Sequence, residues 1–260
     1  MTRPFEGVKI LDFTQVLAGP YASYQLALLG ADVIKVERRE GEDMRRTPLS
    51  REWADRGLAP GWQAINGNKR SLTLDLSKPE AIAIVKQLAE LADVVMENFR
   101  PGVMDRLGIG YAALSQINPK LIYCAVSGFG QTGPERSGAG YDGKIQALSG
   151  IMAITGHQET GPTRAGFAVC DVLSGATAAF GISSALFQRT HTGKGQLVDV
   201  SCWRHRWRFC RDRWRTTPSP GIVSNCPATR PSAAGRPPIC SRRATAICCS
   251  PSTARSNTAR

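Results

Sequence analysis

Short apolar runs alternate with longer segments of helical pattern along most of the chain. Val8–Phe13 (VKILDF) is a short apolar run, which favours a strand. The Gly-Pro pair at 19–20 opens an apolar, helix-permissive stretch, and Gly30 suits the position just after its end. Ala31–Val36 (ADVIKV) then predicts a second, buried strand. Strand, helix and strand within about 30 residues form a βαβ unit, which implies parallel strands and a right-handed crossover.

The same alternation continues to residue 200 and predicts further elements of both kinds. Strands are expected at Ser71–Leu76, Ala92–Met96, Leu121–Val126 and Gln196–Val200. Helices are expected at Pro79–Leu91, after Pro101, after Tyr111 and from about Asp171 to Arg189. We therefore predict an α/β fold with an open, mainly parallel, Rossmann-like sheet and flanking helices.

Residues 202–260 break this pattern, because neither the helical nor the strand period persists over a useful length. The segment holds seven of the sixteen prolines, six of the eight cysteines and +11 of the net charge of +12. Ordering a chain costs about 1–2 kcal/mol per residue, and such a sequence buries too little apolar surface to offset that cost. We expect an irregular Arg/Pro-rich tail.

Two interpretations of the tail differ in function. The first is a nucleic-acid-binding arm, because aromatic residues that could stack on bases are interleaved with arginine: Trp203, Trp207, Phe209 and Trp214. The second is translation out of frame in a GC-rich coding sequence, which yields Arg, Pro, Ser and Cys and nearly abolishes Lys and Glu. We favour the second, with 1–201 as an incomplete N-terminal domain and 202–260 as an out-of-frame, disordered tail, and expect no specific nucleic-acid partner.

Other features of the sequence bear on the cellular location of the protein and on metal or cofactor binding. Met1–Gly7 shows no secretory signal pattern, and no run approaches the roughly 18 apolar residues of a membrane helix, so we expect a cytoplasmic protein without a membrane partner. Two isolated thiols before the tail, Cys124 and Cys170, fit a reducing compartment. No Walker loop, dinucleotide fingerprint or zinc-type spacing is present, so we predict no metal.

Asp171 is the main candidate for chemistry in residues 1–201. It stands in an apolar setting at the start of a predicted helix rich in Ala and Gly. One interpretation is an N-cap, whose side chain accepts backbone N–H bonds. The other is a carboxylate nucleophile that attacks an acyl carbon.

Several motifs occur in order along residues 1–201: LDFTQVLAGP (11–20), GADVIKVERREGEDMRR (30–46), NGNKRSLTLDL (66–76), ADVVMENFRPGVMDRLGIGY (92–111), SGFGQTGP (127–134), YDGKIQALSGIMAITG (141–156) and GFAVCDVLSG (166–175). Together they resemble the class III CoA-transferase family, which includes formyl-CoA transferase and carnitine-type CoA-transferases. The resemblance covers nearly all of 1–201 and none of 202–260. Family members are longer and pair as homodimers, so the resemblance implies a truncated version of their fold.

The resemblance also implies roles for individual residues. Asp171 matches the catalytic aspartate, which attacks an acyl-CoA and passes CoA to a carboxylic acid through an aspartyl anhydride and an aspartyl-CoA thioester. CoA and acyl-CoA are then substrates, and no permanently bound cofactor is implied. The family's CoA contacts match Leu17, Ala18, Arg38, Asn66, Gly67, Asn68, Lys69, Asn98, Phe99, Arg100, Arg106, Gly138, Ala139, Gly140 and Tyr141. Arg38, Lys69 and Arg106 are the charged members expected near phosphate, and SGFGQTGP is expected to position the site.

An α-methylacyl-CoA racemase of the same fold family is the alternative enzyme. Racemases use a His and Asp pair to move a proton beside the thioester. Here Tyr141 precedes Asp142 at the place of that histidine, and His157 and His191 lie outside the motif. We therefore favour the transferase over the racemase.

Overall fold

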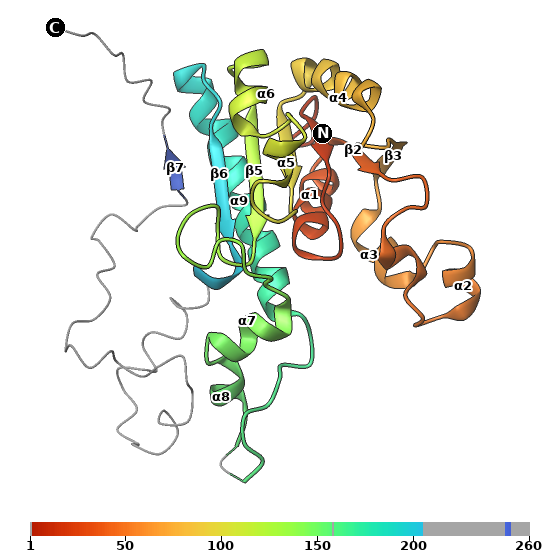
Figure 1. Ribbon diagram of the computed structural model, residues 1–260, viewed down its shortest axis with the longest axis vertical. Helices are drawn as coiled ribbons and strands as arrows, with labels where there is room; N and C mark the ends of the chain where they lie inside the picture. Colours follow the sequence, from red (N-terminus) through yellow and green to blue (C-terminus); the bar gives the residue numbers. More distant parts are fainter. Residues whose placement is uncertain (1, 158, 205–247, 251–260) are drawn as a thin grey trace, which may run out of the picture.

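A computed structural model describes residues 2–157, 159–204 and 248–250 (Figure 1). Its strands are β1 (Lys9–Asp12), β2 (Asp32–Glu37), β3 (Lys69–Thr73), β4 (Val94–Glu97), β5 (Ile122–Ser127), β6 (Leu197–Ser201) and β7 (Cys248–Ser250). They form one sheet in the order β3-β2-β1-β4-β5-β6-β7. Strands β1 to β6 are parallel and β7 runs antiparallel to β6. The predicted α/β fold with an open, mainly parallel sheet is confirmed.

Helices connect the strands. They are α1 (Ala18–Leu28), the 3-10 helix η1 (Asp43–Arg46), α2 (Arg51–Asp55), α3 (Pro60–Asn66), α4 (Pro79–Leu91), α5 (Val103–Arg106), α6 (Tyr111–Ile117), α7 (Asp142–Leu148), α8 (Ile151–Thr155) and α9 (Val169–Thr192). Helix α4 has the bounds that its sequence pattern predicts. The short helices η1, α2, α3, α7 and α8 were not predicted, and the strand expected at Ser71–Leu76 begins earlier, at Lys69.

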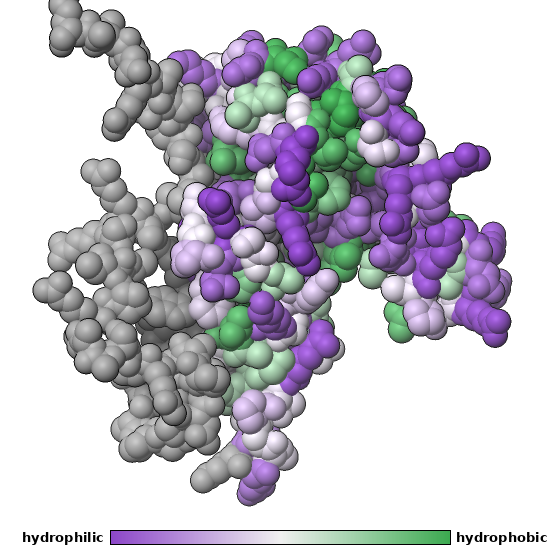
Figure 2. Space-filling model, in the orientation of Figure 1, coloured by the Kyte–Doolittle hydropathy of each residue, from purple (hydrophilic) through white to green (hydrophobic). Residues whose placement is uncertain are grey.

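The sheet is covered on both faces, which gives three layers. Side chains alternate along each strand, so Ile10 of β1 packs with α1 and α9 while its neighbour Leu11 packs with α4 and α6. Helices α7 and α8 extend beyond the carboxyl ends of the strands, and α2 and α3 lie to one side (Figure 1). Hydrophilic residues cover most of the α2 region at the right of the space-filling view, so this region adds little to the core (Figure 2).

Helix α9 is the longest element, with 24 residues. By length and composition it is the one helix among the described residues that could cross a membrane, which the sequence had not led us to expect. Half of its most apolar window is buried inside the structure, against α1 and the sheet. This burial is typical of the core helix of a folded domain, which passes the same test.

The predicted irregular tail falls mainly on residues 205–247 and 251–260, which lie outside the described residues. Cys202 to Arg204 add a helical turn to the end of β6. Trp203 packs against the core, with its ring centroid 6.2 Å from that of Phe129. This aromatic residue of the segment therefore has a partner within the fold.

Gly175 lets α9 and α1 approach backbone to backbone. A Cβ added there would lie 2.5 Å from the carbonyl oxygen of Ala18 and 2.9 Å from the ring of Tyr21. We expect Gly175→Ala to lower the free energy of unfolding by about 1–3 kcal/mol, although alanine is the better helix former. Gly143 in α7 is the matched control, because its nearest added contact is 3.9 Å away. Urea unfolding of both variants tests this, and equal stability of the two would contradict it.

Candidate active site at the carboxyl ends of the strands

The sheet order places a crevice between β1 and β4. From β1 the chain proceeds outward to β2 and β3, and it then returns to the other side of β1 to form β4. Open parallel sheets bind ligands beyond the carboxyl ends of the strands at such a reversal. A cavity of about 240 Å³ lies there. Its lining follows β1, β4, β5 and β6 and includes the start of α9: Val16, Leu17, Ala18, Asn98, Phe99, Arg100, Pro101, Val126, Ser127, Gly128, Gly138, Ala139, Gly140, Tyr141, Asp171 and Cys202.

Asp171 lies in the first turn of α9, half-buried, and lines the cavity. The N-cap of α9 is Ala168, so the interpretation of Asp171 as the N-cap is wrong. A negative charge in the first turn of a helix is favoured by the unpaired N–H groups there. The carboxylate is therefore both accessible and electrostatically supported.

The side chain that caps α9 comes from Asp142, at the start of α7. Its Oδ1 accepts the backbone N–H of Cys170 at 2.7 Å and that of Asp171 at 3.3 Å. Its Oδ2 accepts a bond from Gln146 Nε2 at 2.6 Å and lies 3.4 Å from Arg164 Nη2. Asp142 is buried, so it fixes the turn that carries Asp171. Sequence reasoning named Asp142 without this role, because the contact spans 28 positions.

Two glycine-containing loops cross above the end of β5. A Cβ added at Gly128 would lie 2.6 Å from the Cα of Gly140, and one added at Gly140 would lie 2.4 Å from the Cα of Gly128. The SGFGQTGP loop therefore touches the 138–141 segment through bare backbone, which requires glycine at both positions. Both glycines line the cavity, so the crossing shapes its wall.

Ten of the residues singled out from the sequence meet at this cavity: Leu17, Ala18, Asn98, Phe99, Arg100, Gly138, Ala139, Gly140, Tyr141 and Asp171. Arg106 instead lines a second cavity of about 550 Å³, together with Glu97, Gln131 and Arg136. Pro101 borders both cavities. The two cavities are therefore adjacent, with the loop that follows β4 between them.

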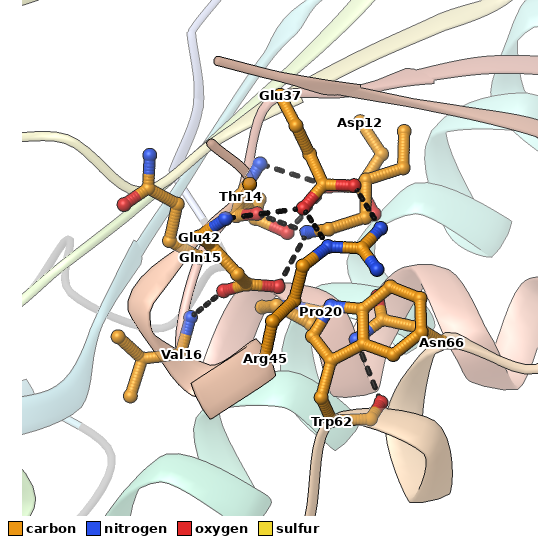
Figure 3. Close-up of polar contacts among 12 residues, drawn as sticks. Asp12, Thr14, Gln15, Val16, Pro20, Glu37, Glu42, Arg45, Trp62 and Asn66 are labelled. Carbon is orange, nitrogen blue, oxygen red and sulfur yellow. Dashed lines mark hydrogen bonds and ion pairs between the residues drawn. The ribbon is translucent and has the colours of Figure 1, made fainter. Parts of the chain in front are cut away.

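The remaining five candidates, Arg38, Asn66, Gly67, Asn68 and Lys69, are not among the residues that line either cavity. Lys69 Nζ contacts Asp12 Oδ2 at 3.1 Å, the Pro20 carbonyl oxygen at 3.0 Å and Asn66 Oδ1 at 2.8 Å. These three acceptors match the three donors of an ammonium group, and burial lowers the pKa of Lys69 despite the attraction of Asp12. Asp12, Pro20 and Asn66, which supply these acceptors, are labelled in Figure 3. Arg38 pairs with exposed Asp43.

The two cavities differ in the ionisable side chains that line them. Neither cavity is lined by a histidine, and Tyr141, at the place of the racemase base, is 76% exposed. Within ranges 2–157, 159–204 and 248–250, no group of His, Cys, Asp and Glu side chains is placed to hold a metal ion. Among the described residues, Asp171 supplies the acidic side chain that lines the first cavity.

Glu97, at the end of β4, is a buried carboxyl group beside the second cavity. Burial raises its pKa from 4.5 to about 8, with a further rise from Asp105 and Asp199 and an opposing effect of the Phe99 N–H. That N–H lies 2.8 Å from Glu97 Oε2. At neutral pH the side chain is therefore mainly protonated, and it holds the loop that carries Asn98, Phe99 and Arg100.

Comparison with known proteins gives a family match. The model of CoA-transferase family III matches residues 5–235. The match therefore extends past Ser201, where the resemblance was expected to end. The chain is 44% identical over 202 residues to a succinate–glutarate CoA-transferase of Agrobacterium fabrum, covering 76% of this chain and 50% of the relative. It is 41% identical over 213 residues to the human succinyl-CoA:glutarate CoA-transferase, covering 78% of this chain and 48% of the relative.

A solved structure shows the same fold. The crystal structure of a CAIB/BAIF family protein from Brucella suis aligns with a TM-score of 0.77 at 39% identity. The alignment covers 83% of this chain and 57% of that protein. The chain thus spans about half the length of the curated relatives that it matches.

The raised pKa of Glu97 predicts a pH-dependent stability. The folded protein keeps a proton that the unfolded chain loses above pH 4.5, so stability falls as pH rises until about 8. The expected slope is about 1.4 kcal/mol per pH unit. Glu97→Gln keeps an acceptor for the Phe99 N–H and should remove this component. Exposed Glu90 in α4 supplies the control variant Glu90→Gln. Urea unfolding across this pH range tests it; a slope unchanged by Glu97→Gln would refute it.

Proposed function

This chain belongs to CoA-transferase family III, and from that premise we propose that it transfers CoA from an acyl-CoA donor to a carboxylic acid, with Asp171 as the nucleophile. The observation that carries this proposal is the convergence of ten sequence-matched residues on one cavity. The names of the two relatives pair succinate with glutarate. Both are dicarboxylic acids, and we propose an acceptor of this class.

The chemistry proceeds by covalent exchange at one carboxylate. An oxygen of Asp171 attacks the acyl carbon of the donor, the C–S bond breaks, and CoA leaves as a thiolate. The thiolate then attacks the aspartyl carbon of the mixed anhydride, and the donor acid leaves as a carboxylate. The acceptor carboxylate attacks the resulting aspartyl-CoA thioester and again releases the thiolate. Attack of the thiolate on the acceptor acyl carbon yields the new acyl-CoA and restores Asp171.

The two cavities fit the two ends of a CoA thioester. The first contains Asp171 and would take the thioester, with Asn98, Phe99 and Arg100 along its wall. The second carries the exposed cations Arg106 and Arg136 and would take the phosphate-bearing end. CoA would pass between them beside Pro101, which borders both.

Lys69 and Asn66 would support the loop at the edge of this site and would not contact the phosphates. The Lys69 ammonium pairs with Asp12, whose carboxylate also accepts the Thr14 N–H at 2.9 Å. We propose that they hold the loop before Leu17 and Ala18 and that phosphate contacts fall to Arg100, Arg106 and Arg136. Arg38, Gly67 and Asn68 would contact CoA only at the outer edge of the site.

The remaining proposals concern the whole protein. We propose that it works in the cytoplasm as a homodimer and has no specific nucleic-acid partner. We also propose that the functional domain ends near Ser201 and that 202–260 is an out-of-frame tail. Sequencing the gene around the codons for Ser201 and Cys202 tests the boundary. An in-frame reading that keeps the tail would refute it.

Asp171→Asn tests the nucleophile directly. The amide keeps the size of the side chain but lacks the anionic oxygen that forms the anhydride. We expect the variant to fold and to bind CoA, and to lose acyl exchange by about three or more orders of magnitude. The wild-type chain incubated with succinyl-CoA and hydroxylamine should carry a hydroxamate at Asp171, located by peptide mass spectrometry.

The control is Asp142→Asn, which also removes a carboxylate near the first turn of α9. It should still give a hydroxamate at Asp171, because the amide oxygen of Asn accepts the same N–H bonds. A hydroxamate at Asp142 instead, or near-normal transfer by Asp171→Asn, would overturn the assignment.

Arg106→Ala tests the phosphate end of the site. Loss of a charge-assisted contact should weaken CoA binding by about 1–3 kcal/mol, with little effect on the midpoint of thermal unfolding because the side chain is exposed. Arg70→Ala is the matched control, since Arg70 is an exposed arginine paired with Asp32 on the outer strands. Calorimetric titration with CoA measures both. Equal affinities for the two variants would contradict this placement.

A further inference from the structure

Val16 has a strained backbone beside the candidate nucleophile. Its φ is +68°, in the left-handed region that β-branched residues rarely enter. Its side chain is 50% exposed and lines the same cavity as Asp171. Strain of this kind persists only where the surroundings impose it, so the contacts around Val16 identify what imposes it.

A buried ion pair holds both ends of the strained segment. Lys35 Nζ lies 3.0 Å from Glu42 Oε1, and both side chains are 2% exposed. The ammonium also donates to the carbonyl oxygen of Thr14 at 2.7 Å. The other oxygen of Glu42, Oε2, accepts the N–H of Val16 at 2.7 Å. We call Lys35 and Glu42 the clamp; Figure 3 shows the bond from Val16 to Glu42.

Further contacts fix Glu42 of the clamp, and others fix Gln15, which lies between Thr14 and Val16. The Glu42 N–H donates to Glu37 Oε1 at 3.2 Å, and Glu37 pairs with Arg45, whose guanidinium lies 3.7 Å from the Trp62 ring centre (Figure 3). Gln15 is tied to Asn98 in both directions. Its N–H donates to Asn98 Oδ1 at 2.8 Å, and Asn98 Nδ2 donates to its carbonyl oxygen at 2.7 Å.

A glycine would adopt the backbone of Val16 without strain. A hydrophobic interior cannot explain the valine, because half of the side chain is exposed. What the valine adds is two methyl groups on the wall of the cavity that contains Asp171. Apolar contact at this position suits the uncharged, thioester-bearing arm of a CoA substrate.

We propose that Val16 is a substrate-contacting residue for the thioester-bearing arm of acyl-CoA, and that Lys35 and Glu42 are positioning residues that hold it in its strained conformation. This inference rests on the proposed function of the cavity. A buried ion pair adds little net stability compared with apolar residues of the same size. The clamp therefore acts through geometry, by fixing Val16 and with it Leu17 and Ala18.

The first test separates stability from binding in Val16→Gly. Relief of strain should leave the midpoint of thermal unfolding unchanged or higher, while affinity for a non-reactive thioether analogue of succinyl-CoA should fall about tenfold, the effect of lost methyl contacts in a pocket. A residue with a purely structural role would lose stability and keep its affinity. That result would overturn the assignment of Val16.

The second test addresses the clamp through Glu42→Gln, with exposed Glu40→Gln as the control. Without ligand, amide hydrogen exchange at Val16 should accelerate at least tenfold in Glu42→Gln, because the neutral amide can still accept the N–H but loses the pairing with Lys35 that holds the side chain in place. Exchange at Val16 should remain at the wild-type rate in Glu40→Gln. Analogue affinity should also fall in Glu42→Gln. In the Val16→Gly background the same substitution should cause little further loss, because glycine needs no clamp. Independent, additive losses, or unchanged exchange at Val16, would refute the clamp.

The outcomes that refute the clamp differ from those that refute the proposed function. A protein that binds the analogue but forms no adduct at Asp171 would refute the nucleophile and leave the clamp standing. A wild-type chain that does not bind the analogue would refute the CoA site and the substrate contact of Val16. Exchange at Val16 would then decide the clamp alone.

Discussion

Carboxylates and amides that accept backbone N–H groups hold the loops around the cavity. The pairs are Asp12 with Thr14, Asn98 with Gln15, Glu42 with Val16, Glu97 with Phe99, Asp199 with Gln131, and Asp142 with Cys170. Where parallel strands end together, the chain leaves the hydrogen-bonded ladder, and its buried N–H groups need other acceptors. A carboxylate supplies two oxygens and can satisfy two groups at once. The conformation of the loops around the site therefore depends on these acceptors.

Burying a charged carboxylate is unfavourable in free energy, and the structure avoids an isolated buried charge in two ways. Asp12 and Glu42 are paired with buried lysines, Lys69 and Lys35. Glu97 has no ion pair within the part of the chain that the structure describes, and its pKa of about 8 leaves it mainly uncharged at neutral pH. Paired or protonated, each group keeps its acceptor role without an isolated charge in the interior.

Much of the fold could be predicted because its main elements have local signals. The apolar runs predicted β1, β4, β5 and β6, and the period of Pro79–Leu91 predicted α4 to the residue. Helices α2 and α8 have five residues each, too few to show a helical period. The strand expected at Ser71–Leu76 was placed too late. Its bounds follow from pairing with β2, where Lys69 lies opposite Val33, a long-range constraint that no local pattern contains.

The candidate site could be predicted where motifs identified residues, and could not where distant partners decide a role. Asp171 was found from its motif, but its cap, Asp142, is 29 positions away. Lys69 was expected near phosphate because the resemblance matched it to a CoA contact. The structure pairs it in the interior with Asp12, 57 positions earlier, a contact that no local pattern contains.

The charges that remain for a ligand are on the outer side of the site. Arg100, Arg106 and Arg136 are exposed and line the two cavities, and the described residues form no ion pair with them. The buried acceptors face inward to backbone N–H groups. Because the two sets are separated, an anionic ligand would meet cations without competing for the bonds that hold the loops. Residues 1–201 have a net charge near zero, yet exposed arginines line the two cavities. Both hold because some of the acidic groups are buried and accept backbone N–H bonds, whereas these arginines remain in contact with solvent.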